Sequence, residues 1–319
     1  MSHFDVFNGD ADGICALIQL RQQNPLDSTR ITGVKRDISL LQQVEAQAGD
    51  QITVLDISLD KNRDALIDAL QLGAEVQYFD HHYAGEIPDH PGLTANIDTS
   101  PTTCTSLLVD QFLNGQYRAW AVTAAFGDNF YESAVAAAQP LSLSEQQLDQ
   151  LRELGTYINY NGYGSAISDL HFDPDRLYQL MLPYTNPLDF IAADPGFKQL
   201  QSGYLEDMQK AQALKAENEQ AGSTVFVLPD AAWARRVSGV YGNELARQYP
   251  QRAHALLTHK SQGGYLVSVR APVSNRAGAD ALCRQFETGG GRAAAAGINH
   301  LPDDAFDTFV QRFQEAYPG

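Results

Sequence analysis

Three short apolar runs in the first part of the chain each lead into acidic residues. Residues 4–7, 52–55 and 76–79 are rich in Phe, Val, Leu and Tyr, and each is followed at once by polar residues. Runs of this length, bounded in this way, are typical of buried strands. Helical patterns over 14–23, 38–48 and 61–72 alternate with the runs and with a further strand at 30–34. This alternation predicts an α/β fold with a parallel sheet and helices on both faces.

The residues that follow the three runs have the composition of a metal site. The first run leads into Asn-Gly-Asp-Ala-Asp-Gly at 8–13, the second into Asp56, and the third into Asp-His-His at 80–82. In a parallel sheet the carboxyl ends of the strands open on one crevice, so four Asp and two His are expected to meet there. An Asp between a strand and a helix is often only a cap, and a buried His is often only hydrogen-bonded. A cap needs only one acid for each helix, however, and clustered carboxylates repel one another, so the combination indicates bound cations.

These motifs resemble those of the DHH phosphoesterases, a family named for the triplet found here at 80–82. Residues 8–13 resemble the first motif of the family, 54–56 the second and 127–129 the fourth. Near the end of the chain, 267–270 and 289–292 resemble the domain that is usually attached to the first one. The resemblance spans nearly the whole chain. It implies an N-terminal metal-binding domain and a smaller α/β domain that binds substrate.

The resemblance also implies roles for individual residues. By position, the metal ligands are Asp10, Asp12, Asp56, His81, Asp128 and, more weakly, Asn8. Two Mn²⁺ ions are expected, bridged by Asp56, with Mg²⁺ or another divalent ion as the alternative. Asp80 is expected to orient an imidazole, and His82 to face the substrate phosphate as an acid or an electrostatic stabiliser.

Two departures from the family pattern bear on these roles. Many relatives have His at the position of Asn8; a neutral amide would hold one ion more loosely or only orient a water. In the C-terminal part, the residues expected to bind substrate are Arg270, Gly289, Gly290, Gly291 and Arg292. Most relatives have His where Arg292 stands, and a permanent cation suits phosphate binding better than proton transfer. The alternative for the three glycines is a plain flexible loop.

The length and composition predict two soluble domains. The 319 residues are enough for two cores, and we expect a catalytic domain at 1–195, a linker helix at 196–222 and a smaller α/β domain at 223–319. No apolar run approaches the roughly 18 residues of a membrane span, and no signal peptide is visible, so a cytoplasmic protein is expected. The three cysteines are widely separated and are expected to be reduced thiols.

The charge distribution favours a small substrate. Residues 1–222 hold 12 Lys and Arg against 31 Asp and Glu, a net of −19, whereas 223–319 hold 10 against 8, a net of +2; together they give the overall −17. Long nucleic acids are bound through rows of cations, which an acidic surface opposes. We therefore expect no binding to long duplexes or membranes, and leave open a homodimer.

The function expected is a metal-dependent phosphodiesterase that hydrolyses short oligonucleotides to mononucleotides. Dinucleotides, including the linear products of cyclic dinucleotides, are the favoured substrates. The alternatives are a cyclic dinucleotide phosphodiesterase, a RecJ-like single-strand exonuclease, and a nucleotide sensor without catalysis. Asn8 and Arg292 are the residues that support the sensor.

Overall fold

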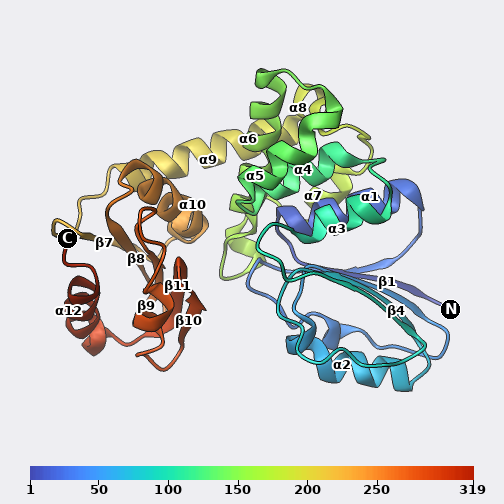
Figure 1. Ribbon diagram of the computed structural model, residues 1–319, viewed down its shortest axis with the longest axis horizontal. Helices are drawn as coiled ribbons and strands as arrows, with labels where there is room; N and C mark the ends of the chain where they lie inside the picture. Colours follow the sequence, from blue (N-terminus) through green and yellow to red (C-terminus); the bar gives the residue numbers. More distant parts are fainter. The chain divides into compact units, whose positions relative to one another are not determined.

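The computed structural model describes residues 1–319 and divides into two compact units, Met1–Ser202 and Gly203–Gly319 (Figure 1). The first unit contains a five-stranded parallel sheet in the order β2-β1-β3-β4-β5. Its strands are β1 (His3–Phe7), β2 (Thr29–Ile31), β3 (Gln51–Leu55), β4 (Glu75–Asp80) and β5 (Leu93–Ile97). The predicted parallel sheet is therefore confirmed.

Helices cover both faces of this sheet. The helices of the unit are α1 (Ala11–Gln23), α2 (Leu59–Gln71), α3 (Thr105–Phe112), α4 (Arg118–Gly127), α5 (Tyr131–Ala138), α6 (Glu145–Gly162), α7 (Pro174–Met181) and α8 (Pro187–Ala193). Figure 1 shows α2 on one face, with α1 and α3 on the other. On the α2 side, Leu59 and Leu66 pack against Val54, Val76 and other alternate strand residues, because side chains on a strand point to opposite faces.

The helix predicted at 38–48 is absent, and the segment has only a short 3₁₀ turn, Leu41–Gln43. The Asn62 side chain on α2 instead hydrogen-bonds two backbone groups of this segment. Its Oδ1 accepts from the Leu41 backbone N–H at 3.1 Å, and its Nδ2 donates to the Ile38 carbonyl at 2.7 Å. Since Leu40 and Leu41 are buried in the sheet–α2 core, this tertiary contact overrides the local helical pattern.

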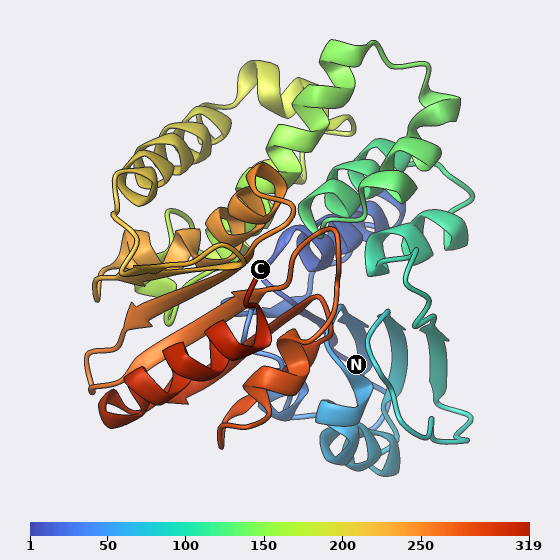
Figure 2. The ribbon, with the colours of Figure 1, turned by 60° about the vertical axis from the view of Figure 1, so that its left-hand side comes forward.

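The second unit is a six-stranded sheet in the order β10-β11-β9-β8-β7-β6. The strands are β6 (Asn218–Glu219), β7 (Ser223–Leu228), β8 (Ala253–His259), β9 (Tyr265–Arg270), β10 (Gly289–Arg292) and β11 (Ala295–Leu301). Only β7 and β8 pair in parallel; the other pairs are antiparallel. α10 (Ala232–Gln248) contacts β8 and β9, whereas α11 (Ala279–Cys283) and α12 (Phe306–Ala316) bury Cys283, Phe309 and Phe313 in the core of the unit. Figure 2 shows α12 lying along the strands.

The helix predicted at 196–222 ends early. It is α9 (Pro195–Gln212), and residues beyond it form β6 at the edge of the second sheet. Outside the strand itself, the Glu217 N–H donates to the Val225 carbonyl at 2.9 Å and the Gln220 N–H to the Ser223 carbonyl at 2.8 Å. This pairing satisfies the exposed edge of β7, which a continued helix would leave open.

The cysteines and the helices bear on two predictions made from composition. Cys15, Cys104 and Cys283 are buried free thiols, as predicted. None of the helices combines the length and the apolar character needed to cross a membrane.

Candidate metal centre

Strand register aligns three of the predicted site residues at one edge of the first sheet. Phe7 pairs with Leu55, which pairs with Phe79. The hydrogen-bond ladder continues past these residues, because the Asn8 N–H donates to the Leu55 carbonyl at 3.1 Å and the Asp56 N–H to the Phe79 carbonyl at 3.0 Å. Asn8, Asp56 and Asp80 therefore stand at the same carboxyl-end edge.

Asp10 and Asp12 come to this edge through the start of α1. Asp10 is the N-cap, and its Oδ1 accepts from the N–H groups of Asp12 and Gly13 at 3.0 and 3.1 Å. The Asp12 carboxylate accepts from the backbone N–H groups of Thr105 and Ser106, at 2.7 and 2.8 Å. Asp12 therefore lies against the first turn of α3, where the helix dipole favours a negative charge.

Asp128 reaches the edge because α4 packs closely against α1. A side chain at Gly127 would lie 2.5 Å from the Ala11 Cβ and 2.6 Å from the Gly155 carbonyl oxygen, so only glycine permits this approach. Asp128 caps the carboxyl end of α4, and its carboxylate lies 20% exposed beside the start of α1.

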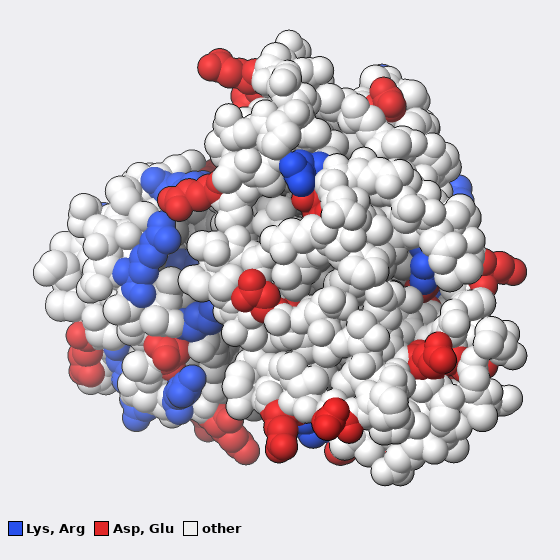
Figure 3. Space-filling model, turned by 45° about the vertical axis from the view of Figure 1, so that its right-hand side comes forward, with Lys and Arg blue, Asp and Glu red and all other residues white.

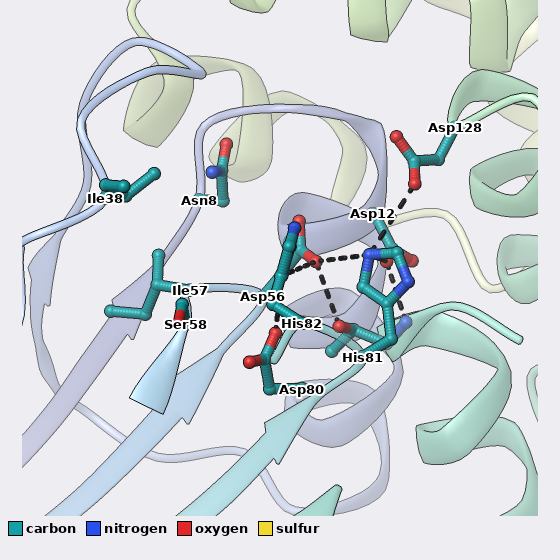
Figure 4. A network of polar contacts seen from close by, with 12 residues as sticks. Asn8, Asp12, Ile38, Asp56, Ile57, Ser58, Asp80, His81, His82 and Asp128 are labelled. Carbon is teal, nitrogen blue, oxygen red and sulfur yellow. Dashed lines mark hydrogen bonds and ion pairs between the residues drawn. The ribbon is translucent and has the colours of Figure 1, made fainter. Parts of the chain in front are cut away.

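The His81 imidazole lies at the centre of these carboxylates (Figure 4). Its Nε2 is 3.5 Å from Asp56 Oδ1, 3.7 Å from Asp128 Oδ2 and 3.9 Å from Asp12 Oδ2. On the other side of the ring, Nδ1 lies 3.2 Å from the Thr103 carbonyl oxygen. A carbonyl can only accept, so Nδ1 carries a proton towards Thr103, and Nε2 is the ring nitrogen that faces the carboxylates and any cation bound among them.

The spacing and charge of this cluster fit a divalent cation. Ligand atoms about 2.1 Å from one ion lie between about 3 and 4.2 Å apart, as the His81–carboxylate distances do. Two overlapping groups, Asp12–His81–Asp128 and Asp56–His81–His82, each have ligand atoms within 4.8 Å of one another. Burial raises the pKa of Asp12 and Asp56, and neighbouring carboxylates raise the pKa of both further. A cation at this point would relieve that repulsion.

Asp80 and His82 form a hydrogen-bonded pair beside the cluster. His82 Nδ1 lies 2.7 Å from Asp80 Oδ1, and Asp80 is fully buried whereas the His82 side chain is 37% exposed. Burial lowers the pKa of His82, but the hydrogen bond and charge of Asp80 outweigh it and leave that pKa raised. The pair therefore favours an imidazolium that solvent or a ligand can reach.

Sequence reasoning missed a cation inside the site. Lys35 Nζ contacts Asp10 Oδ2 and lies 3.1 Å from Asp128 Oδ1 and 2.9 Å from Asn159 Oδ1. Although burial lowers the pKa of Lys35, the charges of Asp10 and Asp128 raise it well above its ordinary value. Asn8 donates from Nδ2 to the Lys35 carbonyl at 3.1 Å. Lys35 belongs to none of the motifs, so no signal in the sequence pointed to it.

A cavity of about 410 Å³ lies at the opposite edge of the same sheet. Gln51, Glu75 and Thr94, at the starts of β3, β4 and β5, are among its lining residues. The acids and imidazoles described above are not among them. Because ligands of parallel α/β sheets bind outside the carboxyl ends of the strands, the His81 cluster is the candidate functional site.

In the second unit, Arg270 and Arg292 occupy one row of the sheet. Ala295 on β11 pairs with Arg292 on one side and with Arg270 on the other, so both arginines share a face. Arg270 donates from Nε to Asn243 Oδ1 at 2.7 Å and from Nη1 to Ser268 Oγ at 2.9 Å, whereas Arg292 is exposed. On the face shown in Figure 3, most basic side chains gather at the left, whereas acidic ones are spread over the whole face.

The three glycines form strand β10, so the alternative of a plain flexible loop is wrong. Packing alone explains two of them. A side chain at Gly289 would lie 1.7 Å from the Cys283 carbonyl oxygen, and Gly291 has a φ of 139° and lies against Ala296. Nothing lies within 4 Å of a side chain placed at Gly290, which pairs with Gly297 on β11, so no packing contact explains this glycine.

Comparison with known proteins places this two-unit architecture among the DHH-type folds. No family model matches the sequence, and no curated protein matches it either. Among solved structures, exonuclease RecJ bound to manganese has a TM-score of 0.63 at 16% identity, over 99% of this chain and 90% of that one. The resemblance to DHH phosphoesterases is thus confirmed at the level of the fold.

Two further structures share the fold. RecJ from Thermus thermophilus, in complex with Mn²⁺, has a TM-score of 0.63 at 16% identity, over 98% of this chain and 51% of that one. PggH, a pGpG-specific phosphodiesterase from Vibrio cholerae, has a TM-score of 0.53 at 12% identity, over 99% of this chain and 98% of that one.

Proposed function

We propose that this chain is a divalent-metal-dependent phosphodiesterase that hydrolyses short oligonucleotides, dinucleotides above all, to mononucleotides. The observation that carries the proposal is the gathering of Asp12, Asp56 and Asp128 around His81 Nε2, at 3.5 to 3.9 Å. Carboxylates with one imidazole are the donor set that suits Mn²⁺, and the RecJ structures bound to manganese support this choice of metal.

In this proposal each site residue has a distinct task. The metal is held by His81 and its carboxylate neighbours, with Asp12 and Asp128 in one group of close ligand atoms and Asp56 in the other. A divalent ion bound there supplies Lewis acidity and makes a water molecule more acidic. His82, kept as an imidazolium by Asp80, stabilises charge on the phosphate or donates a proton to the leaving oxygen. Asp80 acts through His82 and is a positioning residue.

The second unit would supply cations for the substrate. Arg270 and Arg292 share a face of its sheet, and the free space beside Gly290 would let a phosphate approach the strand closely. The net charge of +2 over 223–319, against −19 over 1–222, supports a substrate with few phosphates. The name of PggH, a pGpG-specific phosphodiesterase, also favours a dinucleotide.

The other functions remain alternatives. Opening of a cyclic dinucleotide needs the same groups at the metal and differs only in the substrate bound. A RecJ-like exonuclease would need contacts along a longer single strand, which the acidic first unit opposes. A sensor without catalysis would bind nucleotides at this site and leave them intact.

One experiment separates these functions. The protein is assayed with Mn²⁺ on dinucleotides, longer oligomers, cyclic dinucleotides and nucleoside bisphosphates, and products are measured by chromatography. We expect dinucleotides to be hydrolysed fastest. Preference for long strands supports the exonuclease, and preference for cyclic substrates supports ring opening. Nucleotide binding without turnover on any member of the panel refutes the proposed enzyme and supports the sensor.

A further inference from the structure

Lys35 has the surroundings of a bound cation. An ammonium carries three N–H donors, and Lys35 Nζ has three oxygen partners, from Asp10, Asp128 and Asn159. Asp10 and Asn159 are each 2% exposed. The Tyr163 ring lies on another side, with its centroid 5.6 Å from Nζ. These contacts form a preorganised binding site for one positive charge.

The backbone holds Lys35 at this place. The Lys35 N–H donates to the Gly162 carbonyl at the end of α6, at 2.8 Å, and the Lys35 carbonyl accepts from Asn8 Nδ2 at 3.1 Å. The backbone next to Lys35 is packed as tightly, since a side chain at Gly9 would lie 1.9 Å from the Gly33 carbonyl oxygen. Lys35 is therefore positioned by the fold around it.

The contacts of Lys35 engage the ligands that a second divalent ion would need. Asp10 Oδ1 accepts from two backbone N–H groups, and its Oδ2 contacts Lys35. Asn8, which stands where many relatives of the DHH family have His, donates from Nδ2 to the Lys35 carbonyl, whereas its buried Oδ1 has no hydrogen-bond partner and is not engaged by Lys35. The two carboxylate oxygens of Asp128 have different partners: Oδ1 contacts Lys35 and Oδ2 faces His81.

We propose that the ammonium of Lys35 takes the place of one of the two divalent ions, so that the chain binds a single divalent ion beside His81. This inference rests on the proposed function, in which that cluster binds a metal. It revises the two ions implied by the family resemblance. The ion is held by Asp12, His81 and Asp128, whose ligand atoms lie within 4.8 Å of one another, with Asp56 Oδ1 3.5 Å from His81 Nε2 beside them. Lys35 supplies a fixed charge of +1 where a second ion would supply +2.

The test is metal stoichiometry, measured without turnover. The purified full chain is stripped with chelator, titrated with Mn²⁺ by calorimetry, and examined by electron paramagnetic resonance. We expect one ion per chain and the hyperfine pattern of an isolated Mn²⁺. Lys35→Met, which keeps much of the side-chain volume and removes the charge, is expected to bind two ions, with a spectrum broadened by coupling between them.

The outcomes distinguish this inference from the proposed function. Two tightly bound ions in the unaltered protein overturn the role of Lys35 and leave the proposed phosphodiesterase intact. A single ion in Lys35→Met also overturns that role, because removal of the charge should then free the second place. Failure of the unaltered protein to bind any divalent ion refutes the metal site, and the inference with it. Lys61→Met, at an exposed lysine, is the control and should bind as the unaltered protein does.

Discussion

Lys35→Met should destabilise the metal-free protein, because it leaves Asp10 and Asp128 facing each other without a cation. Removal of one partner from a buried ion pair costs about 3 to 5 kcal/mol. Water reaches the Lys35 side chain, which is 24% exposed, so we expect a loss of about 2 to 3 kcal/mol in the free energy of unfolding. Urea denaturation in the presence of chelator, followed by circular dichroism, measures this loss.

Mn²⁺ should narrow the difference in the free energy of unfolding between Lys35→Met and the unaltered protein. A ligand that binds only the folded state stabilises it, and the variant is expected to bind one more ion than the unaltered protein. Lys61→Met should change stability by no more than about 0.5 kcal/mol, since that side chain is exposed. If Lys35→Met unfolds at the same urea concentration as the unaltered protein in chelator, the ammonium does not compensate the two carboxylates and the electrostatic reasoning is wrong.

Three more predictions test other parts of the molecule. Asp56 has a φ of 60°, which Asn adopts readily, so Asp56→Asn should fold and lose Mn²⁺-dependent hydrolysis. The control, Asp68→Asn at an exposed position, should keep that activity, and an active Asp56→Asn would exclude Asp56 from the mechanism. Gly289→Ala should lower the free energy of unfolding by about 1 to 3 kcal/mol, because its side chain would overlap the Cys283 carbonyl. Gly290→Ala should keep the melting temperature and weaken substrate binding, seen as a higher KM; an unchanged KM would argue against a close approach of the substrate there. Burial, with the charge of Arg252, lowers the pKa of His254 from 6.5 to about 4. The neutral His254 side chain therefore contributes fully to stability above pH 6.5, and the free energy of unfolding falls by about 3 kcal/mol as the pH drops towards 4. In urea titrations His254→Gln should lose less stability over that range, and an equal loss would show that protonation of His254 is not the cause.

The order of the strands in the first unit, and the edge at which the acids meet, could be predicted from the sequence. The apolar runs before Asn8, Asp56 and Asp80 become β1, β3 and β4, and their register places those three residues at one end of the sheet. Both results follow from properties that the chain carries locally. A buried strand has an apolar composition, and alternation with helices makes the strands parallel, so their carboxyl ends point the same way.

Contacts between segments that are far apart in the sequence determined the features that the sequence did not predict. The pattern at 38–48 is helical, but Asn62 hydrogen-bonds its backbone, and the end of the predicted linker helix pairs with β7 as β6. Lys35 enters the site because its backbone is held by Asn8 and Gly162, which lie 27 and 127 residues away in the chain. Local propensities are worth only fractions of a kcal/mol per residue, so one well-placed tertiary hydrogen bond or ion pair can override them. The sequence alone therefore determined which strands end in acids, and only the tertiary structure decided which cation those acids already hold.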